Sequence, residues 1–198
     1  MANLEKIKLN EDPFPFVPQS LNQLGIFLLD GSASMLGVGR GGLKKHQEVN
    51  LAVRESLGRL KRSTLRNCFS FAVVVFGIDA AIHTPITPAD DIDDNGSFDP
   101  LEPEIVNGAG TFIGAGLVKC NDLITEFFAN RIAGIPNKVA IVILSDGMSE
   151  GNRTKEIAGK LKQTENVEVY CCHLEVPESG NVEVGATELL QSIATDPV

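Results

Sequence analysis

Two short apolar runs constrain this chain most, because each is apolar on both of its faces and each is followed by an acid. The first run, residues 24–29, stops at Asp30, and the second, residues 139–144, is followed closely by Asp146. A strand that is apolar on both faces suits the interior of a parallel sheet covered on both sides. Ligands of such sheets bind at the carboxyl ends of the strands, which is where both acids are expected.

Further strands and helices alternate along the chain. Apolar runs predict strands over 69–76, 80–83 and 167–174, and the turn at 77–79 predicts a hairpin whose second strand lies at an edge and is ended by Pro85 and Pro88. Helical spacing of apolar residues predicts helices over 49–60, 113–127, 157–161 and 186–193. The predicted fold is a three-layer, doubly wound α/β domain over 23–198, mostly parallel with one antiparallel edge strand, after an extended lead-in over 1–22.

Composition narrows the classes of partner. The chain has 198 residues with 17 Lys and Arg against 26 Asp and Glu, a net charge of −9 that argues against nucleic-acid binding. No apolar run approaches the roughly 20 residues of a membrane span, and the first residues lack the pattern of a signal peptide. The cysteines at 68, 120, 171 and 172 are interpreted as reduced thiols rather than a disulfide or zinc framework. We therefore expect a soluble, cytoplasmic protein.

The residues that follow the first apolar run carry an unusual pattern of oxygen atoms. Asp30, Ser32 and Ser34 stand at alternate positions, so in an extended segment their side chains point the same way. Asp146 adds a second carboxylate at the end of a neighbouring strand, and Thr111 adds a hydroxyl after a glycine-rich turn. Hard oxygen ligands of this kind suit Mg²⁺, Mn²⁺ or Ca²⁺ rather than Zn²⁺.

The proportions of this donor set also indicate a function. Two carboxylates only neutralise a divalent cation, and neutral hydroxyls donate weakly, so the cation retains affinity for a further anionic oxygen. An Asp or Glu of a partner protein fits an open coordination position better than water does. The pattern therefore favours adhesion through a metal bridge, which needs neither a nucleophile nor a general base.

The pattern of these oxygen-bearing residues resembles the metal-ion-dependent adhesion site, DxSxS…T…D, of the von Willebrand factor A domain. The matching residues are Asp30, Ser32, Ser34, Thr111 and Asp146. The resemblance covers most of the chain and implies a non-enzymatic, metal-dependent protein-binding module. It implies that the first three residues bind the cation, that the threonine joins when a ligand is present, and that the last aspartate anchors waters.

Two finer features extend the resemblance. The segments DGSASM and LSDG are similar to bacterial intracellular members of the family, some of which belong to tellurium-resistance or stress operons. The family usually closes with a further strand and helix after the segment that resembles 190–197, whereas this chain stops at Val198. We expect either a shortened chain or another segment, such as the lead-in, covering that edge of the sheet.

Three other interpretations stay open. Asp91, Asp93, Asn95 and Glu102 match the spacing of an EF-hand calcium loop, although prolines on both sides forbid the flanking helices, and they predict a possible second Ca²⁺ site. The glycines of 37–42 match G-x-G-x-x-G but do not directly follow a strand, which disfavours dinucleotide binding. A Mg²⁺-dependent phosphoesterase using Asp30 is the enzymatic alternative.

Overall fold

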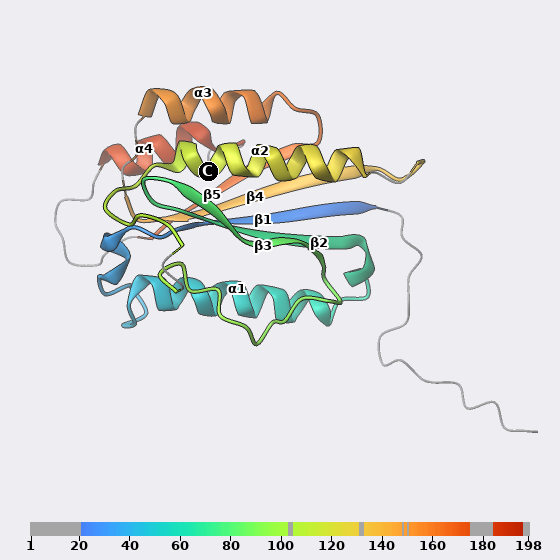
Figure 1. Ribbon diagram of the computed structural model, residues 1–198, viewed down its shortest axis with the longest axis horizontal. Helices are drawn as coiled ribbons and strands as arrows, with labels where there is room; N and C mark the ends of the chain where they lie inside the picture. Colours follow the sequence, from blue (N-terminus) through green and yellow to red (C-terminus); the bar gives the residue numbers. More distant parts are fainter. Residues whose placement is uncertain are drawn as a thin grey trace, which may run out of the picture.

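The computed structural model describes residues 21–102, 105–130, 133–147, 149, 151–174 and 184–195. These residues form a five-stranded sheet of order β3-β2-β1-β4-β5, in which only the β2–β3 pair is antiparallel (Figure 1). The strands are β1 (Asn22–Asp30), β2 (Phe69–Phe76), β3 (Ala80–Pro88), β4 (Asn137–Ser145) and β5 (Val167–His173). The structure confirms the predicted α/β fold with its antiparallel edge strand. Apart from residues 21 and 22, the predicted lead-in lies outside the described residues.

Helices cover both faces of this sheet, which gives the predicted three layers. Helix α1 (Lys45–Lys61) lies on one face, and α2 (Ile113–Ala129), α3 (Gly151–Lys162) and α4 (Val184–Ile193) lie on the other (Figure 1). Two short 3₁₀ helices, η1 (Ala33–Leu36) and η2 (Arg66–Cys68), flank α1 in the chain. Among the described helices, none is long and apolar enough to cross a membrane.

A loop completes the layer that α1 begins. The sequence between β3 and α2 shows no periodicity, yet Ile92 and Phe98 from this loop are buried in the same apolar cluster as Val53 of α1 and Val73 of β2. The backbone N–H of Phe98 also donates a hydrogen bond to Asn50 Oδ1 of α1, at 2.9 Å. The long loop therefore has a structural role, because its two apolar side chains shield the sheet beside α1.

One boundary differs from the prediction. We expected the second strand of the hairpin to end near His83, but β3 continues to Pro88. Its pairing with β2 shifts register between Phe71 and Val74, so the strand passes Pro85 through an irregularity and resumes with Thr87 opposite Phe71. Proline is tolerated there because β3 is the edge strand, where a backbone N–H need not complete the sheet.

The register of the central strands brings the two acidic strand ends together. Leu29 of β1 pairs with Leu144 of β4, and Asp30 pairs with Phe76 of β2, so all three strands end at one edge. The backbone N–H of Gly31 then donates to the Phe76 carbonyl at 2.7 Å, which holds the chain close to the sheet as it leaves β1. The residues after Asp30 and after Leu144 therefore start from fixed, neighbouring positions.

The four cysteines are free thiols with different exposures. Cys68 and Cys120 are buried, Cys171 is half-buried against the helices, and its neighbour Cys172 is exposed because successive side chains of β5 face opposite ways. Burial raises the pKa of the Cys171 thiol to about 12, and the adjacent Cys172 adds to the shift. Only a thiolate reacts readily with alkylating agents.

We therefore predict that iodoacetamide alkylates Cys172 of the folded protein first. Because its pKa is raised to about 12, the Cys171 thiol is almost entirely protonated at mildly alkaline pH and should react at least about 100-fold more slowly than an unperturbed thiol. Mass spectrometry of timed samples measures both rates. Cys172→Ser should remove the fast phase and Cys171→Ser should leave it unchanged; the reverse pattern would contradict the assigned faces of β5.

Candidate metal centre

The carboxylate of Asp30 is fixed at the end of β1. The residue is fully buried, Oδ1 accepts a hydrogen bond from the backbone N–H of Ser32 at 2.9 Å, and Oδ2 accepts one from the Ser145 hydroxyl at 2.5 Å. Ser145 is the last residue of β4, and the sequence analysis did not single it out. Its position directly before Asp146 and beside the end of β1 is the signal that could have identified it.

Burial is also the main electrostatic influence on Asp30. It raises the pKa of this carboxyl group because the charged form loses hydration, and the negative charge of Asp146 acts in the same direction. The hydrogen bonds from Ser145 and Ser32 oppose the shift because they stabilise the carboxylate. Two acids in such a site favour the arrival of positive charge.

Ser32, Ser34 and Asp146 form a chain of hydrogen bonds beside Asp30. The Ser32 and Ser34 hydroxyl oxygens lie 2.8 Å apart, and the Ser34 hydroxyl donates to Asp146 Oδ1 at 2.7 Å. The predicted extended segment ends at Ser32, because Ser34 lies in η1. The two hydroxyl groups nevertheless come together. The structure thus brings together four of the five residues singled out by sequence.

Asp146 also has a positively charged partner. The ammonium group of Lys45, the first residue of α1, pairs with Asp146 Oδ2. Only 8% of the Lys45 side chain and 2% of the Asp146 side chain are exposed. A lysine is rarely buried to this extent without a partner of opposite charge, so the pair is an integral part of the site.

Thr111 approaches the same edge from the loop before α2. A Cβ placed on Gly147, which follows Asp146, would stand 3.2 Å from Thr111 Oγ1. In the described part of the chain, that hydroxyl makes no hydrogen bond to Asp30, Ser32, Ser34 or Asp146. The fifth residue is therefore adjacent to the cluster without being joined to it.

Glycine makes this approach of the loop possible. The Ala33 N–H donates to the Gly108 carbonyl at 2.9 Å, and a Cβ at Gly108 would come within 2.7 Å of the Gly31 carbonyl oxygen. Real Cβ atoms do not come so close to backbone, so any other residue at 108 would displace the loop. Gly108 thus lets the loop that leads to Thr111 pack against the chain at Gly31 and Ala33.

The donor set fits a hard divalent cation. Carboxylate and hydroxyl oxygens are what Mg²⁺, Mn²⁺ and Ca²⁺ prefer, and the buried acids offer negative charge. Within the described residues no three His, Cys, Asp or Glu side chains gather closely enough to hold a metal ion. A cation here would consequently depend on hydroxyl and water oxygens in addition to two carboxylates, as the sequence predicts.

The same finding bears on the calcium loop. The carboxylates of Asp91, Asp93 and Glu102 are not gathered as a metal site. Asp93 Oδ1 instead accepts a hydrogen bond from the Asn95 N–H at 3.0 Å, which is a local turn interaction. The second Ca²⁺ site stays a prediction from spacing.

The G-x-G-x-x-G segment forms a small hairpin between η1 and α1. Val38 bridges to Lys44, and the Gly39 N–H donates to the Leu43 carbonyl at 2.7 Å. The Gly41 N–H, a potential donor to a phosphate, is already bound to Glu48 Oε1 at 2.7 Å. A carboxylate in this place would repel a dinucleotide, in agreement with the sequence analysis.

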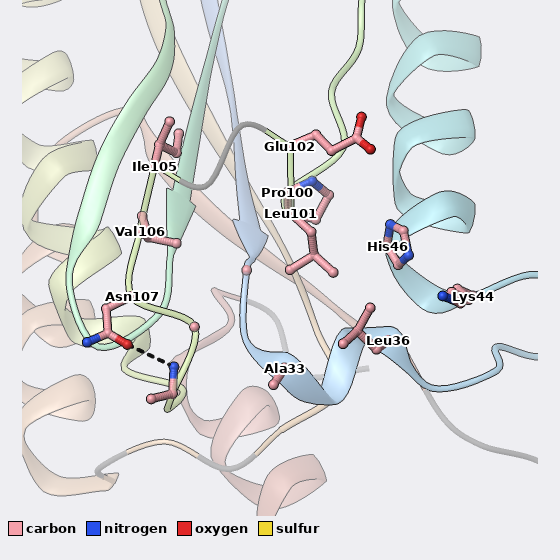
Figure 2. A pocket seen from close by; sticks show the side chains of 13 residues that line it. Ala33, Leu36, Lys44, His46, Pro100, Leu101, Glu102, Ile105, Val106 and Asn107 are labelled. Carbon is pink, nitrogen blue, oxygen red and sulfur yellow. Dashed lines mark hydrogen bonds between the residues drawn. The ribbon is translucent and has the colours of Figure 1, made fainter.

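A pocket of about 650 Å³ lies beside the site, between η1, the start of α1 and residues 100–102 and 105–109 (Figure 2). Its lining is largely apolar and includes Ala33, Leu36, Leu101 and Val106. His46 also lines it; its Nδ1 lies 2.7 Å from Asp99 Oδ2, while its buried Nε2 has no partner in the described part of the chain. Since Gly31 and Gly108 belong to both the pocket and the site loops, the two are contiguous.

The close approach at Gly108 generates a stability prediction. Gly108→Ala should lower the free energy of unfolding by about 1–3 kcal/mol, because the added methyl group overpacks against backbone. Denaturant titration in the presence of a chelator measures this change. Gly159→Ala is the matched control, since nothing lies within 4 Å of its added Cβ and alanine favours the helix. Equal midpoints for Gly108→Ala and the wild type would show that the loop is not tightly apposed.

Several solved structures share this fold. The pilus adhesin SpaC from Lactobacillus rhamnosus GG superposes with a TM-score of 0.69 at 16% identity, over 90% of this chain but only 28% of the adhesin. BatB from Bacteroides thetaiotaomicron gives a TM-score of 0.55 at 20% identity, covering 89% of this chain and 87% of that one. Proximal thread matrix protein 1 from the mussel byssus, in a structure with a zinc-occupied MIDAS motif, gives 0.59 at 17% identity, over 90% of this chain and 40% of that protein.

The first of these similarities leaves most of the larger protein unmatched, and at these identities all three report on the fold alone. No curated protein sequence matches the chain. The von Willebrand factor type A domain, in contrast, matches residues 26–198, which is most of the chain. The protein therefore belongs to the von Willebrand factor type A domain family.

Proposed function

We propose that this chain is a divalent-metal-dependent protein-binding domain. Asp30, Ser32 and Ser34 would hold the cation, Asp146 would hold waters bound to it, and Thr111 would join when a ligand arrives. The cation would supply a positively charged coordination position for an anionic oxygen. An Asp or Glu side chain of a partner protein is the ligand that this position fits best.

The observation that carries this proposal is the hydrogen-bond chain at the end of β1. The Ser32 N–H donates to Asp30 Oδ1, and the Ser32 hydroxyl oxygen lies 2.8 Å from that of Ser34. The Ser34 hydroxyl in turn donates to Asp146 Oδ1, so the contacts join two acids that are 116 positions apart in sequence. Hydroxyl groups arranged in this way can turn their lone pairs toward a cation without a change of backbone. The site therefore needs little reorganisation to bind metal.

The surroundings favour a protein as the ligand over a free anion. The apolar pocket adjoins the site through Gly31 and Gly108, and Leu36 on its rim is 51% exposed. A partner segment that places an acid on the metal would lie across this surface and bury apolar area there. Apolar contact around a central polar anchor is the usual composition of a specific interface.

The phosphoesterase alternative has less support. A nucleophilic carboxylate needs an oxygen that a phosphate can reach, whereas Asp30 is fully buried with a hydrogen bond to each oxygen. The buried cation beside the site, Lys45, pairs with Asp146 and is not directed at an open site. These features suit a ligand-holding role, and we infer a module without enzymatic activity.

For the cellular setting, we infer a cytoplasmic protein with no nucleic-acid partner. The net charge of −9 disfavours a polyanion, and the four cysteines are free. The likeness of DGSASM and LSDG to bacterial intracellular members further supports a bacterial stress-response role as part of this proposal.

The metal assignment is tested by isothermal titration calorimetry with Mg²⁺, Mn²⁺ and Ca²⁺. Asp30→Asn should weaken binding by about 100-fold or more, because it removes one of two carboxylates from a buried site where charge interactions are strong. Asp122→Ala, which removes an exposed aspartate from α2, is the control and should bind like the wild type. If Asp30→Asn binds metal as tightly as Asp122→Ala does, the site is wrongly assigned.

The partner assignment is tested by capture from a lysate of the source cells on immobilised protein. A partner should be retained in millimolar Mg²⁺ and released by chelator, and Asp30→Asn bait should retain none. Amidating the carboxyl groups of the lysate proteins before capture should abolish retention. Retention that survives both chelator and amidation would exclude a metal-bridged acid as the contact.

A further inference from the structure

Lys45 is a buried cation placed directly on one of the two acids of the proposed metal site. Its ammonium group pairs with Asp146 Oδ2, with 8% of the Lys45 side chain and 2% of the Asp146 side chain exposed. Asp146 Oδ1 is simultaneously bound to the Ser34 hydroxyl, which contacts Ser32. The lysine is thus connected through one carboxylate to the hydroxyl groups that would hold the metal.

The backbone around Lys45 is organised to keep it there. The hairpin over 38–44 returns the chain to η1, and the Lys45 N–H donates to the Gly37 carbonyl at 2.9 Å. The two residues that flank Lys45, Lys44 and His46, lie at the start of α1 beside the pocket (Figure 2). Lys44 is exposed, so two adjacent lysines have very different environments.

The electrostatics of a helix N-terminus disfavour a lysine at the first position of α1. The first turn of a helix carries partial positive charge, which repels a cation. Burial adds a desolvation cost to the ammonium group. Within the described residues, Asp146 is the acid that pairs with Lys45, and this ion pair offsets both costs and explains the position of the lysine.

We propose that Lys45 is a built-in counter-ion that competes with the divalent cation and sets the metal affinity of the site, an inference that rests on the proposed function. The two carboxylates and one ammonium group leave the metal-free site with one net negative charge. Without Lys45 the same site would carry two. Whether the ammonium group leaves or stays when metal binds, it opposes a second positive charge close by.

The same charge balance affects the partner. A divalent cation added to two carboxylates and one ammonium group leaves one net positive charge, which a single partner carboxylate neutralises. With Lys45 removed, the loaded site would be neutral before the partner arrives. Lys45 therefore lowers the metal affinity of the site and increases the attraction of the metal-loaded site for one acidic side chain.

The experiment compares Mg²⁺ and Mn²⁺ affinities of wild type, Lys45→Met and Lys44→Met by calorimetry. Lys45→Met should bind metal about tenfold more tightly or better, because the opposing charge is gone. Lys44→Met makes the same chemical change one residue away on an exposed side chain and should match the wild type. A second readout is the melting temperature in chelator, which should fall for Lys45→Met because the Asp146 carboxylate is left without its counter-charge.

Lys45→Gln keeps a hydrogen-bond donor beside Asp146 without the charge, so it serves the titration if Lys45→Met does not fold in chelator. Tighter metal binding by either Lys45 variant supports the counter-ion role, including the case in which the wild type binds too weakly to measure. Unchanged or weaker binding by both, while Asp30→Asn loses binding, overturns the counter-ion role and leaves the metal site standing. Absence of binding in every variant overturns both.

Discussion

The arrangement of the site follows from the burial of the Asp30 carboxylate at the end of β1, which is unfavourable because the charge loses its hydration. A carboxylate removed from water must be compensated by hydrogen bonds or by opposite charge. The Ser32 N–H and the Ser145 hydroxyl provide the hydrogen bonds, but both are neutral donors, and Asp146 brings a second negative charge nearby. The edge of the sheet is therefore left with uncompensated negative charge, and Lys45 and a bound cation are two ways of balancing it.

The choice of hydroxyl groups between the two acids has a consequence for recognition. Had carboxylates stood at the positions of Ser32 and Ser34, a divalent cation would be over-neutralised and would repel an acidic partner. Hydroxyls supply oxygen atoms of the right hardness and leave the charge of the cation available. Their mutual contact at 2.8 Å also means that each is positioned by the other before any ligand binds. This preorganisation lowers the entropy lost on binding.

The central parts of this arrangement follow from the sequence because they lie within a few residues of rigid strand ends. Asp30 is the last residue of β1 and Asp146 directly follows β4. The parallel register of these strands leaves little freedom in where such residues go. Lys45 differs, since its place depends on how the hairpin of 38–44 closes, and no periodic pattern encodes that closure. Ile92 and Phe98 were missed for a related reason. Isolated apolar residues in a long loop have no spacing from which burial can be inferred, so only the packed structure shows that they cover the sheet.

The accessibility of Asp30 distinguishes a nucleophilic role for its carboxylate from a ligand-holding role. A nucleophilic Asp30 would need an oxygen free of hydrogen bonds and open to a phosphorus atom, and full burial with both oxygens occupied opposes this. A ligand-holding Asp30 needs neither condition, because a carboxylate oxygen that accepts one hydrogen bond still has a lone pair for a cation or its water. Ser34, in contrast, is exposed, and its neighbour Ala33 lines the apolar pocket. The site is closed around Asp30 and open at Ser34, where the proposed partner would arrive, and that asymmetry favours the proposed binding role over turnover.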